Sequence, residues 1–465
     1  MMSRPDLKVT IVEYACDVLT YISQNFMEIE RFWREGGVRH YDWEQARDKL
    51  YHETALLLLI CERARQLNIN SAPSVHLAKL FSDYCAENPN IEMICMHPQT
   101  APGVALVPLV TSVIFAQSSD YTRLIRTIIE SGAHGDSERL PFRELERRWV
   151  QGLYGQENSI ADVVDHTLVS KLRDPNGLTR SDVYAITHAI MFATDFGQKP
   201  LVYIDVAEIT HIIDFLAMKS IIDDDLDILG ELLICGSCIR QPPTRVRRIG
   251  IQLIRDVWSR HGLVPGPTFN PKKYKNLDTM RQEIYSILEC YHTTYVAGIM
   301  ELMIAMVGKN NDEFQSDKLP SREWNTHELV QEACNLIDLL QVFPMGLERR
   351  EDYSCERREW RSIMPPRLKR LDSEIGPEIA KDFDLVWAST RGSINDLVAV
   401  LAGTLDHSGV NYPIMIAVKT LIFKTKISMQ YKCASNVFLF DENVVVDIVA
   451  LLRMFVKLSQ SCAVH

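Results

Sequence analysis

The sequence has no uninterrupted apolar run that would cross a bilayer. The longest extends from Val104 to Ala116 and is broken by Pro108, Thr111 and Ser112, whereas a membrane helix needs about 20 consecutive, mainly apolar residues. Charged side chains also interrupt the first 23 residues, so we expect no secretory signal there. These absences favour a protein without a membrane-spanning segment.

An excess of basic charge is also missing. The chain has 50 Lys and Arg residues against 61 Asp and Glu residues, which gives a formal net charge of -11. Phosphate contacts require a concentrated basic surface, so this balance argues against a nucleic-acid partner. The 11 cysteines are odd in number and scattered, and they do not form the framework of a small disulfide-rich domain. We therefore expect thiols in a reducing cytoplasm.

Clear alternation of apolar and polar residues, the pattern of a half-buried strand, is scarce. Steps of three and four residues dominate instead, as in Val12, Ala15, Leu19 and Ile22, and this period is typical of a helix with one buried face. The sequence predicts an all-α fold of about fifteen or more helices. Paired helices joined by short turns suit either a helical solenoid or an α/α toroid, and the pattern does not decide between them.

Breaks in the helical pattern predict three regions. They are an N-terminal helical region over 1–175, a helical core over 176–309 and a C-terminal helical region over 322–465. The segment between the last two is polar, has no apolar period and ends near Pro320, which is typical of a linker or long loop.

Titratable side chains interrupt apolar helix faces within 181–301, and the first group lies on a predicted helix over 181–194. Tyr184 and His188 are one turn apart, and Asp195 is two turns after His188, so they share a face if the helix continues. Two turns rise about 10 Å, too far for His188 and Asp195 to bind one metal ion together. They would line a cavity, or His188 would make a hydrogen bond within the core and Asp195 would cap a turn.

The second group lies on a predicted helix over 223–239. Glu231 is flanked by leucines on an apolar helix, where an unpaired carboxylate is costly. Asp223 and Asp224 with Asp227 also match the acid pattern by which class I terpenoid synthases hold magnesium and diphosphate. Capping of the helix start by Asp223 and Asp224 explains the same residues without any ligand.

The third group centres on His292, in a predicted helix over 278–307. Glu289-x-x-His292 and Glu208-x-x-His211 both have the carboxylate and imidazole spacing of helical di-iron carboxylate proteins. A di-metal site would thus add Glu208, His211 and Glu289 to the candidate ligands. Two ordinary amphipathic helices are the simpler interpretation of both pairs.

Four short motifs together resemble a family of uncharacterised bacterial proteins associated with gene clusters for specialised metabolites. They are Tyr184-x-x-Thr187-His188, Thr194-Asp195-Phe196-Gly197, Asp225-x-Asp227-x-x-Gly230-Glu231 and Tyr291-His292-Thr293-Thr294. The resemblance implies a wholly helical fold, in some members with segments similar to the repeats of α/α-toroid enzymes such as triterpene cyclases. It carries over His188, Asp195, Glu231 and His292 as positions of interest, but it implies no particular reaction.

These observations lead to a cytoplasmic helical enzyme of antibiotic, toxin or other specialised-metabolite biosynthesis, acting on a small molecule. We expect His292, Glu231 and His188 to be ligands of a divalent iron, zinc or manganese ion, or His292 and Glu231 to act as an acid and base. Asp195 would orient an imidazole, and Tyr184 would donate to a substrate oxygen. A helical scaffold that binds a partner protein or a carrier-bound intermediate is the main alternative, and a magnesium- and diphosphate-dependent terpenoid cyclase is the third.

Overall fold

The computed structural model is helical, and the residues that it describes contain no strand, as the sequence predicts. The described residues are 6–35, 43–69, 72–87, 91–132, 138–156, 159–171, 174–202, 204–310, 327–342, 377–405, 411–435 and 444–462. The predicted linker over 310–321 lies outside them, apart from residue 310. The helices pack into two units, which are described separately.

Unit 1 contains Met1–Leu172, Arg180–Ile209 and Asp225–Ser316. It includes most of the first two regions that the sequence predicts. Its helices are α1 (Leu7–Gln24), α2 (Phe26–Arg34), α3 (Trp43–Gln66), α4 (Val75–Glu87), α5 (Ile91–Met96), η1 (Pro98–Thr100), α6 (Ala101–Val104), α7 (Leu106–Val113), α8 (Asp120–Ser131), α9 (Pro141–Leu153), α10 (Ala161–Val164), α11 (Leu168–Lys171), α12 (Arg180–Ala193), α14 (Leu226–Cys238), α15 (Arg245–His261), α16 (Pro271–Lys275) and α17 (Thr279–Asn310).

Unit 2 contains Arg173–Thr179, Thr210–Asp224 and Asp317–His465, and so includes most of the third predicted region. Helix α13 (Val206–Ile222) contributes its first residues to unit 1 and the rest to unit 2. The other helices of unit 2 are α18 (His327–Val342), α20 (Pro377–Thr390), α21 (Ile394–Leu405), α22 (Tyr412–Ser435) and α23 (Val444–Cys462). The chain turns at Gly392, between α20 and α21.

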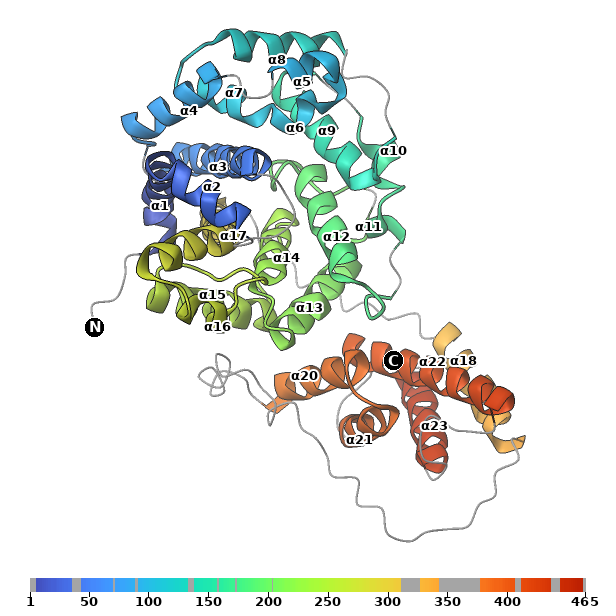
Figure 1. The fold of residues 1–465 in the computed structure, drawn as a ribbon. Coiled ribbons are helices and arrows are strands. Elements are labelled where there is room, and N and C mark those ends of the chain that lie inside the picture. The colour runs from blue at the N-terminus through green and yellow to red at the C-terminus, as the bar shows by residue number, and fades with distance from the viewer. Residues whose placement is uncertain are drawn as a thin grey trace. The chain divides into compact units, whose positions relative to one another are not determined.

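Four helices of unit 1 follow one another in space and position the candidate site. Helix α3 packs on α17, α17 packs on α14, and α14 packs on α12 (Figure 1). Every residue of α14 is buried. Gly230 allows α14 and α17 to approach closely, because a Cβ atom there would lie 2.6 Å from Cγ1 of Val296. The glycine of the Asp225-to-Glu231 motif is thus explained by packing.

Two of the site helices have ends that differ from the expected ones. Helix α14 begins at Leu226 because Asp225 caps it, its carboxylate accepting from the backbone N–H of Ile228 at 3.1 Å. Helix α12 ends at Ala193, and Asp195 follows in a left-handed turn with a φ of 47°. Asp195 therefore does not continue the helix face of His188.

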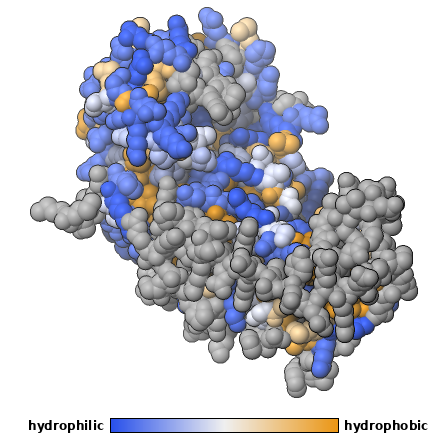
Figure 2. Space-filling model, turned by 60° about the horizontal axis from the view of Figure 1, so that its bottom comes forward, coloured by the Kyte–Doolittle hydropathy of each residue, from blue (hydrophilic) through white to orange (hydrophobic). Residues whose placement is uncertain are grey.

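Helix α17 is the one helix of the described part that is long and apolar enough to cross a membrane. Thr, Glu and His interrupt its apolar residues, so it contains no long uninterrupted apolar run. Other parts of the protein bury 78% of its most apolar window, which accounts for this composition by packing alone. Among the coloured residues in Figure 2, hydrophilic ones predominate and hydrophobic ones are scattered among them.

Candidate functional site

Helices α14 and α17 bring two carboxylates and an imidazole together in unit 1. Asp227 and Glu231 are one turn apart on α14, and His292 lies at the middle of α17. One potential ligand atom from each residue lies within 4.8 Å of the others. Asp227 is 5% exposed and Glu231 is 2% exposed. This group could hold a metal ion, because carboxylate oxygens and imidazole nitrogen are ligands of zinc, iron and manganese.

The Asp227 carboxylate is fixed through both of its oxygens. Arg180 donates to Oδ2 at 2.7 Å and also to Asp225 at 2.8 Å. The hydroxyl of Thr293 donates to Oδ1 at 2.9 Å. Nε2 of His292 lies 3.5 Å from the same Oδ1. The carboxylate is therefore held with one oxygen toward the imidazole and one toward the guanidinium.

Glu231 lies deeper and has fewer partners. The hydroxyl of Thr187 on α12 donates to its Oε2 at 2.5 Å, and Nδ1 of His188 lies 3.6 Å from the same oxygen. Burial, together with the charge of Asp227, raises the pKa of Glu231 to about 8. Without a metal ion beside it, Glu231 is mainly protonated at neutral pH.

His292 lies between two carboxylates from different helices. Its Nδ1 is 3.0 Å from Oε1 of Glu53 on α3, while its Nε2 faces Asp227. Burial lowers the pKa of His292, but the charges of Glu53 and Asp227 outweigh burial and raise it to about 9. Burial raises the pKa of Glu53, but the charge of His292 outweighs this and holds it at about 2. Without a metal ion, the imidazole is thus a cation at neutral pH.

The pKa of His188 is shifted in the opposite direction from that of His292. Burial and the charge of Arg143 lower its pKa to about 3, so the ring is neutral. Nδ1 lies 3.0 Å from the backbone carbonyl of Tyr184, which can only accept, so Nδ1 carries the proton. The ring lies against that of Tyr184, with centroids 3.7 Å apart, and Phe142 contacts both rings edge-on. Burial also raises the pKa of Tyr184.

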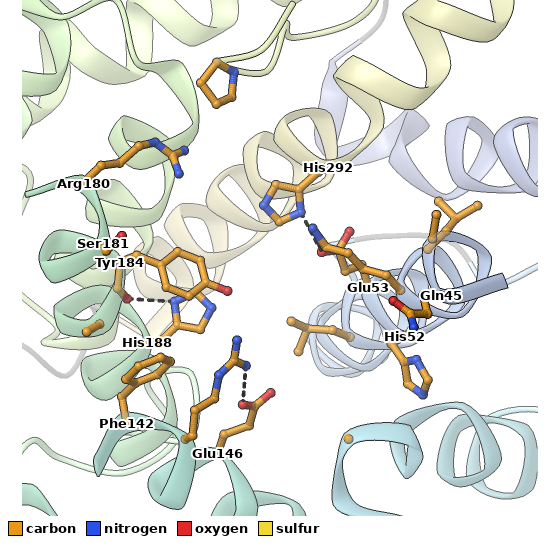
Figure 3. Close-up of a pocket in the computed structure, with 18 of the residues that line it drawn as sticks. Gln45, His52, Glu53, Phe142, Glu146, Arg180, Ser181, Tyr184, His188 and His292 are labelled. Carbon is orange, nitrogen blue, oxygen red and sulfur yellow. Dashed lines mark hydrogen bonds and ion pairs between the residues drawn. The ribbon is translucent and has the colours of Figure 1, made fainter. Parts of the chain in front are cut away.

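These groups lie at a cavity of about 1710 Å³ in unit 1. This volume exceeds the roughly 300–1,000 Å³ of ordinary small-molecule pockets. Glu53 and His292 lie on one side, and Tyr184, His188 and Phe142 lie on another (Figure 3). Asp227 and Glu231 are buried beside His292 and do not line the cavity. A ligand would thus reach the group from the His292 side.

The structure brings together four of the predicted site residues: Tyr184, His188, Glu231 and His292. It places Asp195 elsewhere, because the carboxylate of Asp195 accepts from Arg63 at 2.7 Å and from the indole N–H of Trp149 at 2.6 Å. Its contacts are with a guanidinium and an indole, not with the imidazole that we expected it to orient.

The residues predicted for a second metal do not join the group. Glu208 and His211 are on α13, where the ring of His211 stacks on Tyr412 within unit 2 at 5.7 Å. Glu289 lines the cavity, but its carboxylate accepts from the hydroxyl of Thr268. The group of three therefore contains neither predicted carboxylate and imidazole pair, because His292 belongs to it but Glu289, Glu208 and His211 do not.

The acid pattern suggested for diphosphate binding is divided between two helices. Asp223 is at the end of the α13 segment, with its carboxylate 3.0 Å from Lys219 and 2.6 Å from Arg391 in unit 2. Asp224 has a φ of 56° and separates it from α14. Asp223 and Asp227 therefore do not share one helix face.

Two residues that contact His292 were not predicted from the sequence. Glu53 was not named at all, and Asp227 was not assigned as a partner of His292. A signal for Glu53 was present, because it lies three residues after Leu50 and four before Leu57 on the buried face of α3. An acid on such a face needs a partner. Arg180 gave no such signal, since an arginine at the start of a helix is usual on a solvated surface.

A family model described as a domain of unknown function, DUF6895, matches residues 19–302, which is more than half of the chain. All residues that line the cavity lie between Ile22 and His292, within the matched segment. No curated protein and no solved structure matches the chain.

Proposed function

The chain belongs to the DUF6895 family, and we propose that its matched segment is a metal-dependent enzyme acting on a small molecule in the cavity. Asp227, Glu231 and His292 are the proposed ligands. The metal is a divalent zinc, iron or manganese ion, the ions that mixed carboxylate and imidazole ligands suit.

One observation carries this proposal: three potential ligand atoms from α14 and α17 converge within 4.8 Å beside a large cavity. Without a metal ion, Glu231 is mainly protonated, because burial and the charge of Asp227 raise its pKa to about 8. A divalent ion would replace that proton and stabilise both carboxylates in their charged form. It would also leave coordination positions for water or a substrate oxygen, as catalytic sites with three protein ligands do.

The ion would supply Lewis-acid chemistry when bound. Other residues at the cavity have separate roles in the proposal. His188 carries its proton on Nδ1, so its Nε2 is an acceptor that can take a hydrogen bond from a substrate. Tyr184 keeps its hydroxyl proton because its pKa is raised, and it can donate to a substrate oxygen.

We place the enzyme in bacterial specialised-metabolite biosynthesis. Support for this assignment is the resemblance of the motifs around His188, Glu231 and His292 to proteins from such gene clusters. Family membership is compatible with it but names no reaction.

The proposal is tested by measuring the metal content of protein purified without chelators. We expect wild type to carry close to one zinc, iron or manganese ion per chain, and His292→Ala to carry almost none. Glu146→Gln is the control, because Glu146 lines the same cavity but pairs with Arg143 at 2.7 Å. It should retain the metal.

Circular dichroism and thermal unfolding establish that each variant is folded. Wild-type protein that stays free of metal after incubation with zinc, iron(II) and manganese(II) would overturn the proposal. That result would favour the scaffold that binds a partner protein or a carrier-bound intermediate.

A further inference from the structure

Glu53 occupies the side of the His292 ring that faces away from Asp227. Its Oε1 lies 3.0 Å from Nδ1 (Figure 3). Oδ1 of Asp227 lies 3.5 Å from Nε2, on the other side of the ring. The imidazole thus spans the gap between α3 and α14, although it belongs to α17. Each ring nitrogen has its own carboxylate.

Other contacts fix the Glu53 carboxylate in turn. Lys49, one turn earlier on α3, lies 3.5 Å from the same Oε1. The hydroxyl of Tyr291, the residue before His292, also lies near the Glu53 carboxylate and helps to lower its pKa. The Glu53 side chain is 19% exposed, so little water competes for its oxygens. A fixed acceptor therefore faces Nδ1.

We infer that Glu53 is the positioning residue of the metal site, which orients His292 and keeps the proton on Nδ1 so that Nε2 is the metal-binding atom. This inference rests on the proposed function. A carboxylate accepts but does not donate, so a neutral imidazole beside it carries its proton on the nitrogen that faces the carboxylate. Metal-binding histidines commonly have such a partner on the other nitrogen.

Holding α3 against α17 does not require Glu53. The hydroxyl of Thr54, the next residue on α3, donates to the hydroxyl of Tyr295 on α17 at 3.1 Å. Thr54 is fully buried. This second contact joins the same two helices one turn along α17 and involves no potential ligand. It provides a matched control that separates positioning of the imidazole from packing of the helices.

The test compares wild type, Glu53→Gln and Thr54→Val for binding of Zn²⁺, measured by competition with a chromophoric chelator. The Gln side chain has the size of Glu but is a weaker acceptor and can also donate. We expect Glu53→Gln to raise the Kd for Zn²⁺ by about 10- to 100-fold, the usual effect of removing such a partner. Thr54→Val should lower the melting temperature and leave the Kd within about twofold of wild type, since it removes the hydrogen bonds of Thr54 to Tyr295 and to the Leu50 carbonyl and touches no potential ligand.

A second measurement reports which nitrogen of the His292 ring carries the proton. In ¹⁵N NMR spectra of the zinc-loaded wild type, Nδ1 of His292 should carry the proton and Nε2 should bind the metal. Glu53→Gln should weaken or reverse that preference, whereas a purely structural role of Glu53 would leave it unchanged.

The outcomes separate the two proposals. Zn²⁺ binding in wild type with an unchanged Kd and tautomer in Glu53→Gln would overturn the role of Glu53 and leave the proposed function standing. Absence of binding of Zn²⁺, iron(II) and manganese(II) in wild type would overturn both. A similar rise of the Kd in Thr54→Val would reduce Glu53 to a packing role.

Discussion

Arg63 on α3 binds Asp195 twice, donating to its carboxylate at 2.7 Å and to its backbone carbonyl at 3.0 Å. The indole N–H of Trp149 on α9 donates to the same carboxylate at 2.6 Å. Asp195 lies in the left-handed turn after α12, where non-glycine residues are uncommon. Its side chain therefore joins three helices at a turn that is unfavourable by itself.

Asp195→Asn should lower the free energy of unfolding by about 2–3 kcal/mol, because it leaves a largely buried guanidinium without its charged partner. Metal content should stay at the wild-type value, since the Asp195 carboxylate contacts Arg63 and Trp149 and not the ligand group. Urea unfolding and metal analysis on the same samples check both parts. Loss of metal from a stably folded variant would contradict this assignment.

Metal-free protein should lose stability as the pH rises from about 6.5 to about 9, above the range in which the lowered pKa of His188 has the opposite effect. The folded state raises the pKa of Glu231 from 4.5 to about 8 and that of His292 from 6.5 to about 9. Over this range the folded protein therefore holds protons that the unfolded chain has released, so the free energy of unfolding falls with pH.

Thermal unfolding at pH 6 to 9.5 measures this effect. Glu231→Gln should remove the part of the stability loss that occurs below about pH 8, because the amide of Gln does not titrate. A melting temperature that stays constant or rises up to pH 9 would be incompatible with these raised pKa values.

Binding of Zn²⁺ at pH 7 should release about two protons per ion, because metal ligands must be deprotonated. They come from Glu231 and His292, whose pKa values are about 8 and about 9 in the metal-free protein. The affinity should rise about 100-fold per pH unit below pH 8 and level off above about pH 9. Calorimetry in buffers with different ionisation enthalpies counts the protons. A release near one would exclude one of these ligands, and a release near zero would exclude both.

Gly266→Ala should destabilise the protein by about 1–3 kcal/mol through overpacking. A Cβ atom at Gly266 would lie 2.5 Å from the backbone carbonyl oxygen of Glu289, which its N–H now contacts at 3.0 Å. The substitution would push the loop that carries Pro267 and Thr268 to the cavity away from α17. Gly152→Ala is the control, because no atom lies within 4 Å of its Cβ position. Thermal unfolding that is equal in both variants would contradict the predicted clash.

The all-helical class and several site residues can be predicted from sequence because they depend on local pattern. Glu231 and His292 interrupt apolar helix faces, and burial of such groups demands partners. The partners of Asp195 cannot be predicted in this way, since Trp149 and Arg63 precede it by 46 and 132 residues. The role that we expected for Asp195 assumed that α12 continues, but the left-handed turn ends that helix face. The spacing of apolar residues in a sequence predicts whether a side chain is buried. It does not predict which residue far along the chain that side chain contacts.

The dispersion of the site over α3, α12, α14 and α17 has a kinetic consequence. Its contacts, such as that of Glu53 with His292, join residues far apart in the chain, so a large loss of chain entropy precedes their formation. Folding dominated by contacts of this kind is slow. The carboxylates of α14 are synthesised before α17 and meet their imidazole only after that helix docks, so the site forms late in folding.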